Sequence, residues 1–337
     1  MRQALTFVSL NHESTPRHGK TRTHLSRART ALFAGGFIAA AALAFLLSGY
    51  QLFQATMIIA YGVALLGLNI LTGYNGQISL GHGAFFALGS YLTAVLMTSF
   101  GVPFWAAVVA SGAASMAVGY AFGIPAVRLE GLYLALATFA LGVAVPQLLK
   151  AHFLEQWTGG VQGISLDKPE APFGLPLSPD QWLYLCALIA AVFLFWTAIN
   201  LLQGEPGRIM RAIRDHEIAA QAMGVNTSHY KALTFSVSAG YTGIGGGISA
   251  LAVQFVAPDS FTMFLSISLL VGIVIGGIGT VWGAFFGAVF ILFVPALAES
   301  VSKAAPWAVY GGVLIIFMFL MPSGVVGLLR RVLHWRN

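Results

Sequence analysis

The sequence has very few charged residues: they make up 8% of 337 positions, whereas 58% are hydrophobic and the mean hydropathy is +0.82. Apolar runs of about 20 residues, the length that spans a bilayer core, recur along the chain. A soluble globular protein is therefore excluded. The runs are too long and too uniformly apolar for barrel strands of roughly 10 alternating residues. The sequence predicts an all-α polytopic membrane protein folded as one helical bundle.

Carboxylates are missing from the places where an ion-driven carrier needs them. Glu130, Glu155 and Glu299 all lie at the boundaries of apolar runs or in loops. Carriers driven by protons or sodium usually keep carboxylates inside their spans despite an insertion cost of about 2.5–3.5 kcal/mol, because these side chains bind the coupling ion. We therefore expect the energy for transport to come from elsewhere. A channel or secondary carrier stays an alternative, although no ring of charges or repeated carbonyl filter is present.

Cysteine and nucleophile motifs are also scarce. The single cysteine, Cys186, lies in an apolar run, so neither a disulfide nor a cysteine-based zinc site can form within the chain. The nearest approach to a serine-nucleophile turn is Ser236-Val-Ser-Ala-Gly240, which lacks the glycine two places before Ser238. We expect no catalytic residue, no metal and no cofactor bound by this chain.

About ten apolar runs are candidate spans, several of them short or broken by glycine. They cover residues 31–50, 54–71, 78–100, 103–127, 132–149, 182–202, 232–256, 264–281, 284–298 and 306–328. Four pairs of glycines at four-residue spacing clear one helix face for close backbone contact, and we interpret them as mainly structural. These pairs are Gly119 and Gly123, Gly243 and Gly247, Gly272 and Gly276, and Gly283 and Gly287.

Basic residues sort to one side of the predicted bundle. Fourteen of the 17 Lys and Arg residues share a side with the N-terminus, in residues 1–30, 128–130, 203–231 and 330–337. Only Lys150, Lys168 and Lys303 fall opposite. The positive-inside rule then places the N-terminus in the cytoplasm. The net charge of +6 follows from this orientation beside anionic lipid and requires no nucleic-acid partner.

Three parts of the chain follow from this pattern. Residues 1–30 are predicted to be a disordered basic cytoplasmic tail, residues 31–329 a transmembrane domain, and residues 330–337 a basic cytoplasmic C-terminus. The transmembrane domain includes an outward loop at 150–181 and a cytoplasmic segment at 204–231. Within the tail, Gly19-Lys20-Thr21 is similar to the end of a phosphate-binding loop, but the first glycine, the strand and the helix that such a site needs are missing.

Polar residues gather where apolar runs are interrupted. Residues 73–83 read Gly-Tyr-Asn-Gly-Gln-Ile-Ser-Leu-Gly-His-Gly, and broken helix ends of this kind can bind the charged termini of a substrate. The candidate path residues here are Asn75, Gln77, Ser79, His82 and Gly83. An equally favoured alternative is a tight turn with close packing over the glycines, in which His82 only bonds to a neighbouring helix.

Two further glycine-rich segments stand out. Residues 158–164, Thr-Gly-Gly-Val-Gln-Gly-Ile, lie in the outward loop and could form a short lid or docking surface, although a surface turn is the favoured interpretation. Residues 276–283, Gly-Gly-Ile-Gly-Thr-Val-Trp-Gly, are denser in glycine than packing requires. We expect a second helix break there, near the path.

The segment 207–224 is the most strongly charged stretch between the spans. Pro206 and Gly224 mark the ends of one predicted helix, whose apolar stripe contains Ile209, Ala212, Ile213, Ala220 and Met223. Three arginines, Arg208, Arg211 and Arg214, descend another face, with Arg211 expected to pair with Asp215 and Arg214 with Glu217. The stripe suits docking in the groove of a partner, and an ordinary basic loop on the membrane is the equally ranked alternative.

Five blocks of the sequence resemble the permeases of branched-chain amino-acid ABC importers of the LivM type. The blocks are residues 73–89, 128–138, 158–164, 207–224 and 276–283, and they occur in the order of that family between about residues 50 and 328. The departures are a longer basic tail and Ala284, where many relatives have proline.

The resemblance implies a bacterial inner-membrane subunit that works by alternating access. It implies a second homologous permease, two cytoplasmic ATPases that hydrolyse the ATP, and a periplasmic binding protein as partners. The implied substrate is Leu, Ile or Val, with urea, short amides and other amino acids as alternatives. Thr138, Gly277 and Gly279 join the candidate path residues. The implied ATPase-coupling residues are Gly207, Arg208, Arg211, Ala212, Arg214, Glu217, Ala219, Ala220, Met223 and Gly224.

Overall fold

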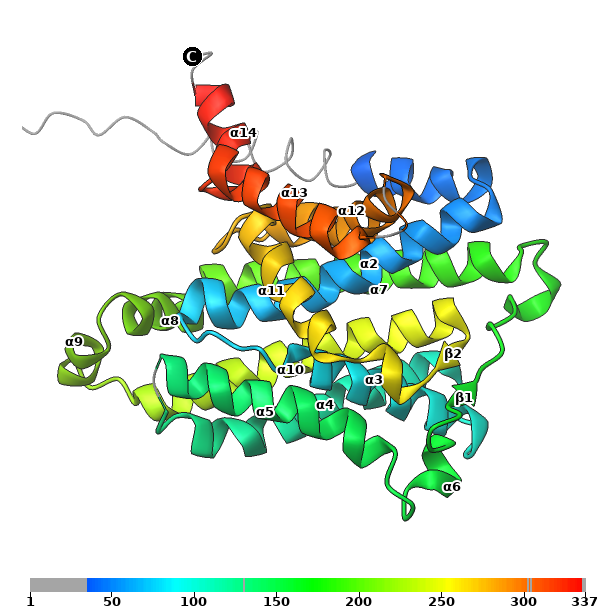
Figure 1. Ribbon diagram of the computed structural model, residues 1–337, viewed down its shortest axis with the longest axis horizontal. Helices are drawn as coiled ribbons and strands as arrows, with labels where there is room; N and C mark the ends of the chain where they lie inside the picture. The colour runs from blue at the N-terminus through cyan, green and yellow to red at the C-terminus, as the bar shows by residue number, and fades with distance from the viewer. Residues whose placement is uncertain (1–34, 130, 302, 304, 335–337) are drawn as a thin grey trace, which may run out of the picture. The chain divides into compact units, whose positions relative to one another are not determined.

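The computed structural model describes residues 35–129, 131–301, 303 and 305–334 (Figure 1). The predicted basic tail, with its phosphate-loop-like segment, lies outside these residues. Residues 35–46 are helical, and the compact unit treated below begins at Ala44.

Helices make up nearly all of this unit. The α-helices are α2 (Gly49–Asn69), α3 (His82–Thr98), α4 (Phe104–Ala126), α5 (Leu132–Leu149), α6 (Glu155–Thr158), α7 (Pro179–Gln203), α8 (Glu205–Asp215), α9 (Glu217–Ala222), α10 (Thr227–Val253), α11 (Met263–Gly276), α12 (Gly283–Val301), α13 (Pro306–Leu320) and α14 (Gly324–His334). The shorter elements are a π-helix, η1 (Ile70–Tyr74), two 3-10 turns, η2 (Pro172–Gly174) and η3 (Pro258–Ser260), and two strands, β1 (Ile164–Ser165) and β2 (Phe255–Val256). The strands pair antiparallel, with Ile164 opposite Val256.

The all-α polytopic prediction is confirmed, and each predicted span falls on a helix. Among the described residues, seven helices are long and apolar enough to cross a membrane. The estimate of about ten differs from seven for two reasons. Residues 35–46 and α3 form shorter apolar helices, and α10 is too rich in Ser, Thr and Gly to count as apolar.

The polar helix α10 lies at the centre of the unit, packed against α2, α3 and α4 (Figure 1). Most of its residues are buried, so its hydroxyl groups face protein rather than lipid and bond to neighbouring backbones. Ser236 Oγ donates to the Met116 carbonyl at 2.7 Å, and Ser238 Oγ donates to the Gly67 carbonyl at 2.6 Å. These interhelical bonds explain why a helix this polar can stand inside the bundle.

Glycines allow the helices around α10 to approach closely. A Cβ on Gly119 would collide with the Ala239 side chain, and a Cβ on Gly243 would collide with the Ser115 side chain, so each helix backbone lies directly against a small side chain of the other helix. The same holds between α11 and α12, where a Cβ on Gly276 would overlap the carbonyl of Gly283. The structural interpretation of the four-residue glycine spacing is confirmed at these contacts.

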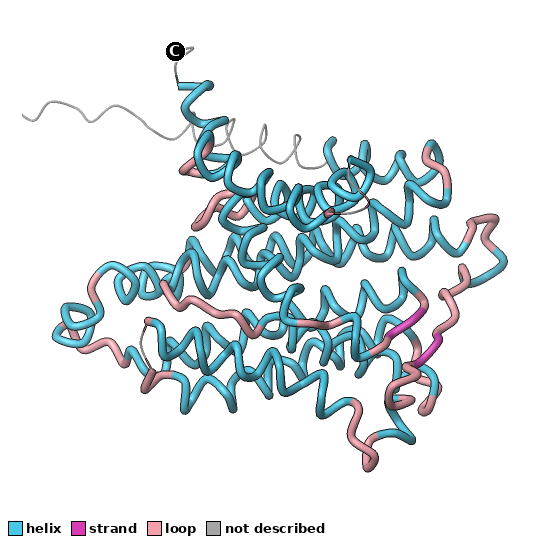
Figure 2. The backbone as a smooth tube through the Cα atoms, viewed as in Figure 1, coloured by secondary structure: helices cyan, strands magenta, loops and turns pink. Residues whose placement is uncertain are grey.

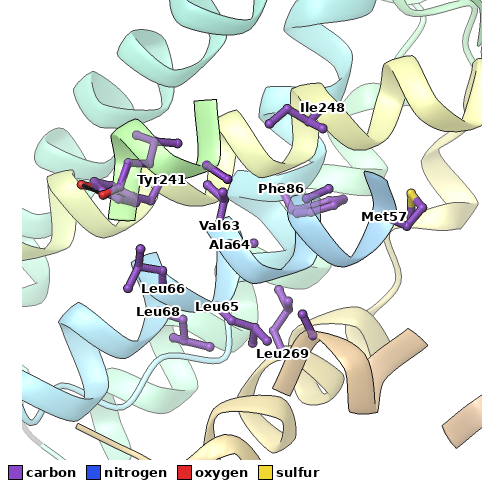
Figure 3. Packing of buried hydrophobic residues seen from close by; sticks show 14 of the residues in the cluster. Met57, Val63, Ala64, Leu65, Leu66, Leu68, Phe86, Tyr241, Ile248 and Leu269 are labelled. Atoms are coloured by element: carbon purple, nitrogen blue, oxygen red, sulfur yellow. Dashed lines mark hydrogen bonds between the residues drawn. The ribbon is translucent and has the colours of Figure 1, made fainter. Parts of the chain in front are cut away.

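Aliphatic and aromatic side chains fill the remaining space between α2, α3, α10 and α11. Leu65 and Leu66 of α2 are completely buried, and Phe86, Ile248 and Leu269 approach from the other three helices (Figure 3). α2 is therefore fixed by packing along most of its length up to the point where it ends.

Two connecting segments, the glycine-rich loop 158–164 and the helices α8 and α9, lie at opposite ends of the long span α7. The glycine-rich loop 158–164 is at the end that also holds β1 and β2, whereas α8 and α9 follow directly on the other end of α7 (Figure 1). The loop is a closed turn in which Gly159, Gly160 and Gly163 all adopt positive φ and the Thr158 hydroxyl bonds to the Leu149 carbonyl. This matches the favoured interpretation of a surface turn.

The placement of these loops generates a test of orientation. In a Cys186→Ala background, we expect cysteine at Val161, which is 66% exposed, to react with an impermeant maleimide in intact spheroplasts. Cysteine at the exposed Ser228 should react only after permeabilisation, because the basic loops favour the inside. The reverse labelling pattern would contradict the orientation.

Candidate functional site

Two interrupted helices meet inside the bundle. α2 continues into the π-helix η1 and stops after Asn75, residues 76–81 run inward without helical structure, and α3 begins at His82 (Figure 2). The second break separates α11 from α12, where Gly277 and Gly279 have φ of 124° and 73°. The break predicted at 276–283 is therefore confirmed. Short π-helical turns such as η1 are frequent at functional sites.

Asn69 joins the two breaks. Its Nδ2 donates to the Thr280 carbonyl at 2.7 Å, and its Oδ1 accepts from the Gly279 N–H at 2.8 Å. Gly73 lies against the same contact, because a Cβ there would collide with Asn69 Oδ1 and approach the Gly279 backbone nitrogen. Gly279 is thus fixed beside η1 rather than beside the later residues of the first break, whereas Gly277 lies near Thr280 and Val326.

The first break is held by hydrogen bonds from three other helices. The Leu80 N–H donates to Thr138 Oγ1 of α5 at 2.9 Å, Gln77 Nε2 donates to the Lys231 carbonyl of α10 at 3.2 Å, and the Gly83 N–H donates to Ser266 Oγ of α11 at 3.0 Å. The structure therefore brings together the predicted residues Asn75, Gln77, Ser79, His82, Gly83 and Thr138, all of them buried.

His82 is fully enclosed. Its Nδ1 lies 2.9 Å from Ser79 Oγ and its Nε2 lies 2.6 Å from Ser238 Oγ. Because the Ser238 hydroxyl already donates to the Gly67 carbonyl, Nε2 carries the proton and Nδ1 accepts from Ser79. Both ring nitrogens are thus used within the chain, as the packing alternative for this residue expected. The Ser238–His82 contact is completely buried, so it offers no accessible nucleophile for hydrolysis.

Asn75 differs from its neighbours. Its side chain is 2% exposed, yet neither Nδ2 nor Oδ1 has a hydrogen-bond partner within the described part of the chain. It borders a cleft of about 530 Å³ between the first break, the start of α5 and the segment from α8 to α9. The lining includes Gln77, Leu129, Leu134, Ile213, Arg214, Glu217 and Lys231.

The charged segment is two helices rather than the single helix predicted over 207–224. α8 ends at Asp215, His216 is extended with φ −157° and ψ 92°, and α9 begins at Glu217. Side-chain bonds to the start of α10 hold α9 in this place, because Lys231 Nζ lies 2.5 Å from Glu217 Oε2 and Gln221 Nε2 donates to Thr227 Oγ1 at 2.9 Å. Gly224, at φ 85°, follows the end of α9 as expected.

Both predicted ion pairs within the segment are wrong. Arg211 donates to the Leu202 carbonyl at 3.0 Å instead of pairing with Asp215. Arg214 pairs with the adjacent Asp215 at 2.9 Å and donates from Nη1 to the Gly73 carbonyl at 2.8 Å. The arginines reach these carbonyls because the last C=O groups of α7 and η1 lack helical partners and attract cations.

The residues of the predicted apolar stripe do not lie on one face. Ile213 and Ala220 are buried within the chain, and Gly207 packs so closely on Leu202 that a Cβ would collide. The outer surface instead carries Ile218 and Met223, which are 82% and 85% exposed. Arg208, Ala212 and Ala219 are exposed as well. A partner would therefore meet Ile218 and Met223 rather than Ala220.

Several residues of the site are not identified by the sequence analysis. Lys231 has the pattern of a loop cation, but it is 8% exposed and paired with Glu217 fourteen residues earlier. Asn69, Ser238 and Ser266 lie in apolar runs, and a hydroxyl or amide inside a span was the only signal that could have found them.

The fold and site define a multi-pass helical membrane protein with two discontinuous helices next to a charged segment, an arrangement typical of transport proteins. Residues 50–321 match the family described as branched-chain amino acid transport system / permease component. The chain belongs to this family. It is a family of transport permeases rather than of catalytic enzymes.

Individual relatives cover most of the chain. The high-affinity branched-chain amino acid transport system permease protein LivM of Salmonella typhimurium is 30% identical over 323 residues, which span 89% of this chain and 75% of that protein. LivM of Escherichia coli K12 is 31% identical over 306 residues, 84% of this chain and 71% of that protein. The high-affinity branched-chain amino acid transport system permease protein LivH of Escherichia coli K12 is 25% identical over 295 residues, 79% of this chain and 91% of that protein.

A substitution at Gly83 distinguishes the two interpretations of the first break, which are close helix packing and the lining of a substrate path. Because a Cβ there would lie 2.5 Å from Ser266 Oγ, we expect Gly83→Ala to destabilise the fold by about 1–3 kcal/mol through overpacking. Adding Ser266→Ala should recover part of that loss in a double-mutant cycle of thermal stability. A fully stable Gly83→Ala protein with impaired uptake would instead support a role in lining the path.

Proposed function

We propose that this chain is the permease subunit of an ATP-driven importer of branched-chain amino acids in the bacterial inner membrane, with its N-terminus in the cytoplasm. It acts with a second, related permease, two cytoplasmic ATPases and a periplasmic binding protein. Hydrolysis of ATP belongs to the ATPases. The substrate is Leu, Ile or Val, in keeping with the names of the LivM and LivH relatives.

The observation that carries this proposal is the direct bond between the charged segment and the first helix break. Arg214 of α8 donates to the Gly73 carbonyl at 2.8 Å, and its aliphatic stem packs on Gly76, where a Cβ would come within 2.9 Å of Arg214 Cγ. Its Nη1 also lies near Gly279 of the second break. A displacement of α8 by an ATPase would therefore act on both breaks at once.

The docking surface in this account is the outer side of α9. Ile218, Ala219, Ala222 and Met223 face outward, while Glu217, Ala220 and Gln221 hold the helix to the rest of the chain. A short exposed apolar patch braced from behind suits insertion into the groove of another protein. The alternating-access cycle then begins at this surface and reaches the breaks through Arg214.

Reconstitution tests the proposal directly. The chain, its sister permease and the two ATPases should import labelled leucine, isoleucine and valine into liposomes only with ATP and the binding protein. Urea, acetamide and other amino acids serve as competitors that define the substrate. Uptake by the chain alone would favour a secondary carrier or channel and contradict the proposal.

The docking surface yields one prediction. Met223→Asp should weaken retention of the ATPases at least roughly tenfold. The change removes an apolar contact of about 1.5–3 kcal/mol that docking would bury, and it places a carboxylate in the groove of the ATPase. Co-purification of the ATPases measures this. The control is Val161→Asp, at a similarly exposed apolar residue on the opposite loop, which should retain the ATPases. Equal retention in both variants would remove α9 from the interface.

Arg214 yields a second prediction. Arg214→Gln loses a charge-assisted hydrogen bond worth about 1.5–3 kcal/mol, so we expect leucine transported per ATP hydrolysed to fall about tenfold or more while the ATPases stay bound. Arg214→Lys should retain part of the coupling. The control, Arg331→Gln, changes an exposed arginine of α14, outside the charged segment, and should leave the ratio unchanged. A normal ratio in Arg214→Gln would contradict transmission through this bond.

A further inference from the structure

The cleft beside the first break contains a polar group that the chain leaves without a partner. The Asn75 amide is almost fully buried, and both of its polar atoms lack hydrogen bonds among the described residues. Buried polar groups are nearly always paired, and an unpaired one is unfavourable for folding. The cleft volume of about 530 Å³ lies within the usual range of small-molecule sites, roughly 300–1,000 Å³. The missing partner of Asn75 is therefore best sought in a ligand.

Among the described residues that line the cleft, two basic and two acidic side chains stand together, beside His216. Lys231 pairs with Glu217 at 2.5 Å, and Arg214 pairs with Asp215 at 2.9 Å. A ligand with a single charge would gain one attraction and one repulsion from these pairs. A zwitterion can align its carboxylate with the cations and its ammonium with the carboxylates. The amide of Asn75 fits the same ligand, since it offers a donor and an acceptor side by side.

Much of the remaining lining is aliphatic, although Gln77, His216 and Gln221 also border the cleft. Ile78 of the break, Leu129 and Leu134 on the α5 side, and Ile213 of α8 border the cleft together with the charged groups. Such walls favour a ligand that also has a branched apolar side chain. We propose that this cleft binds one aliphatic α-amino acid, with Asn75 as the residue that reads its zwitterionic head group. The proposal rests on the proposed function for the substrate class and adds a site next to the charged segment.

The location of the site ties its occupancy to the transport cycle. Ile213 to Ile218, which border the cleft on one side, belong to α8, α9 and the residue between them. Leu134, in the first turn of α5, borders it as well, together with Leu129 and Gly131 just before that helix. Movement of α8 relative to α5 would change the distance between these two groups of residues. We expect the affinity for leucine to differ between the nucleotide-free complex and the complex trapped with ATP.

Binding of labelled leucine to the full complex in nanodiscs, without nucleotide or binding protein, tests the proposal. Asn75→Leu should weaken binding of labelled leucine at least tenfold without lowering the melting temperature, because the new side chain has a similar volume and removes the unpaired amide. Asn200→Leu, at an exposed asparagine near the end of α7, is the matched control and should bind like the wild type. Unchanged affinity in Asn75→Leu, or loss of binding together with a lower melting temperature, would overturn the proposal.

Competition identifies the chemistry that the cleft reads. 4-Methylpentanoate is leucine without the ammonium, and isopentylamine is leucine without the carboxylate, so each should compete at least tenfold more weakly than leucine. Equal competition by either, or competition by acetamide, would overturn the zwitterion assignment. ATP-driven uptake of leucine by the wild-type complex separates the proposed site from the proposed function. If the wild type takes up leucine normally and Asn75→Leu binds it with unchanged affinity, only the proposed site is refuted. If the wild type takes up no leucine, the proposed function is refuted.

Discussion

An interrupted helix inside an apolar bundle is the constraint on which the rest of this structure depends. Each backbone group left unpaired in lipid costs several kcal/mol, so a helix can stop inside the bundle only where other elements supply donors and acceptors. At the first break, Thr138 and Ser266 accept from the backbone N–H groups of Leu80 and Gly83, and the Lys231 carbonyl accepts from the Gln77 side chain. Arg214 donates to the Gly73 carbonyl. The polar central helix, the glycine contacts and the hydroxyls buried in apolar spans all serve this requirement.

The two ends of the first break are anchored to different parts of the protein. Gly73, at its beginning, is bonded to Arg214 of α8, whereas Leu80, near its end, is bonded to Thr138 of α5. Residues 75–78 lie between these anchors and border the cleft. A force on α8 therefore acts on one end of the first break, while α5 holds the other end. This arrangement relates the proposed docking surface to the proposed path without a long chain of intermediate contacts.

Much of this fold is readable from the sequence because lipid imposes simple rules on length and polarity. Span positions, both helix breaks and the glycine contacts follow from apolar runs and glycine spacing. The division of 207–224 into α8 and α9 does not, because Glu217 is drawn to Lys231 by a pair fourteen residues apart. The buried position of Ala220 and the outward position of Met223 follow from that division. Arg214 could be recognised as a charged helix residue, but its bond to Gly73 depends on the π-helix that frees this carbonyl.

The central claim is that α8 and the beginning of the first break move as one body relative to α5. Pulsed electron paramagnetic resonance on the full complex can measure this with two spin-label pairs, 208 with the half-buried position 74 and 208 with the exposed position 133. We expect trapping with ATP to change the distance from 208 to 133 and to leave the distance from 208 to 74 nearly constant. A change in the distance from 208 to 74 as large as that from 208 to 133 would contradict the claim.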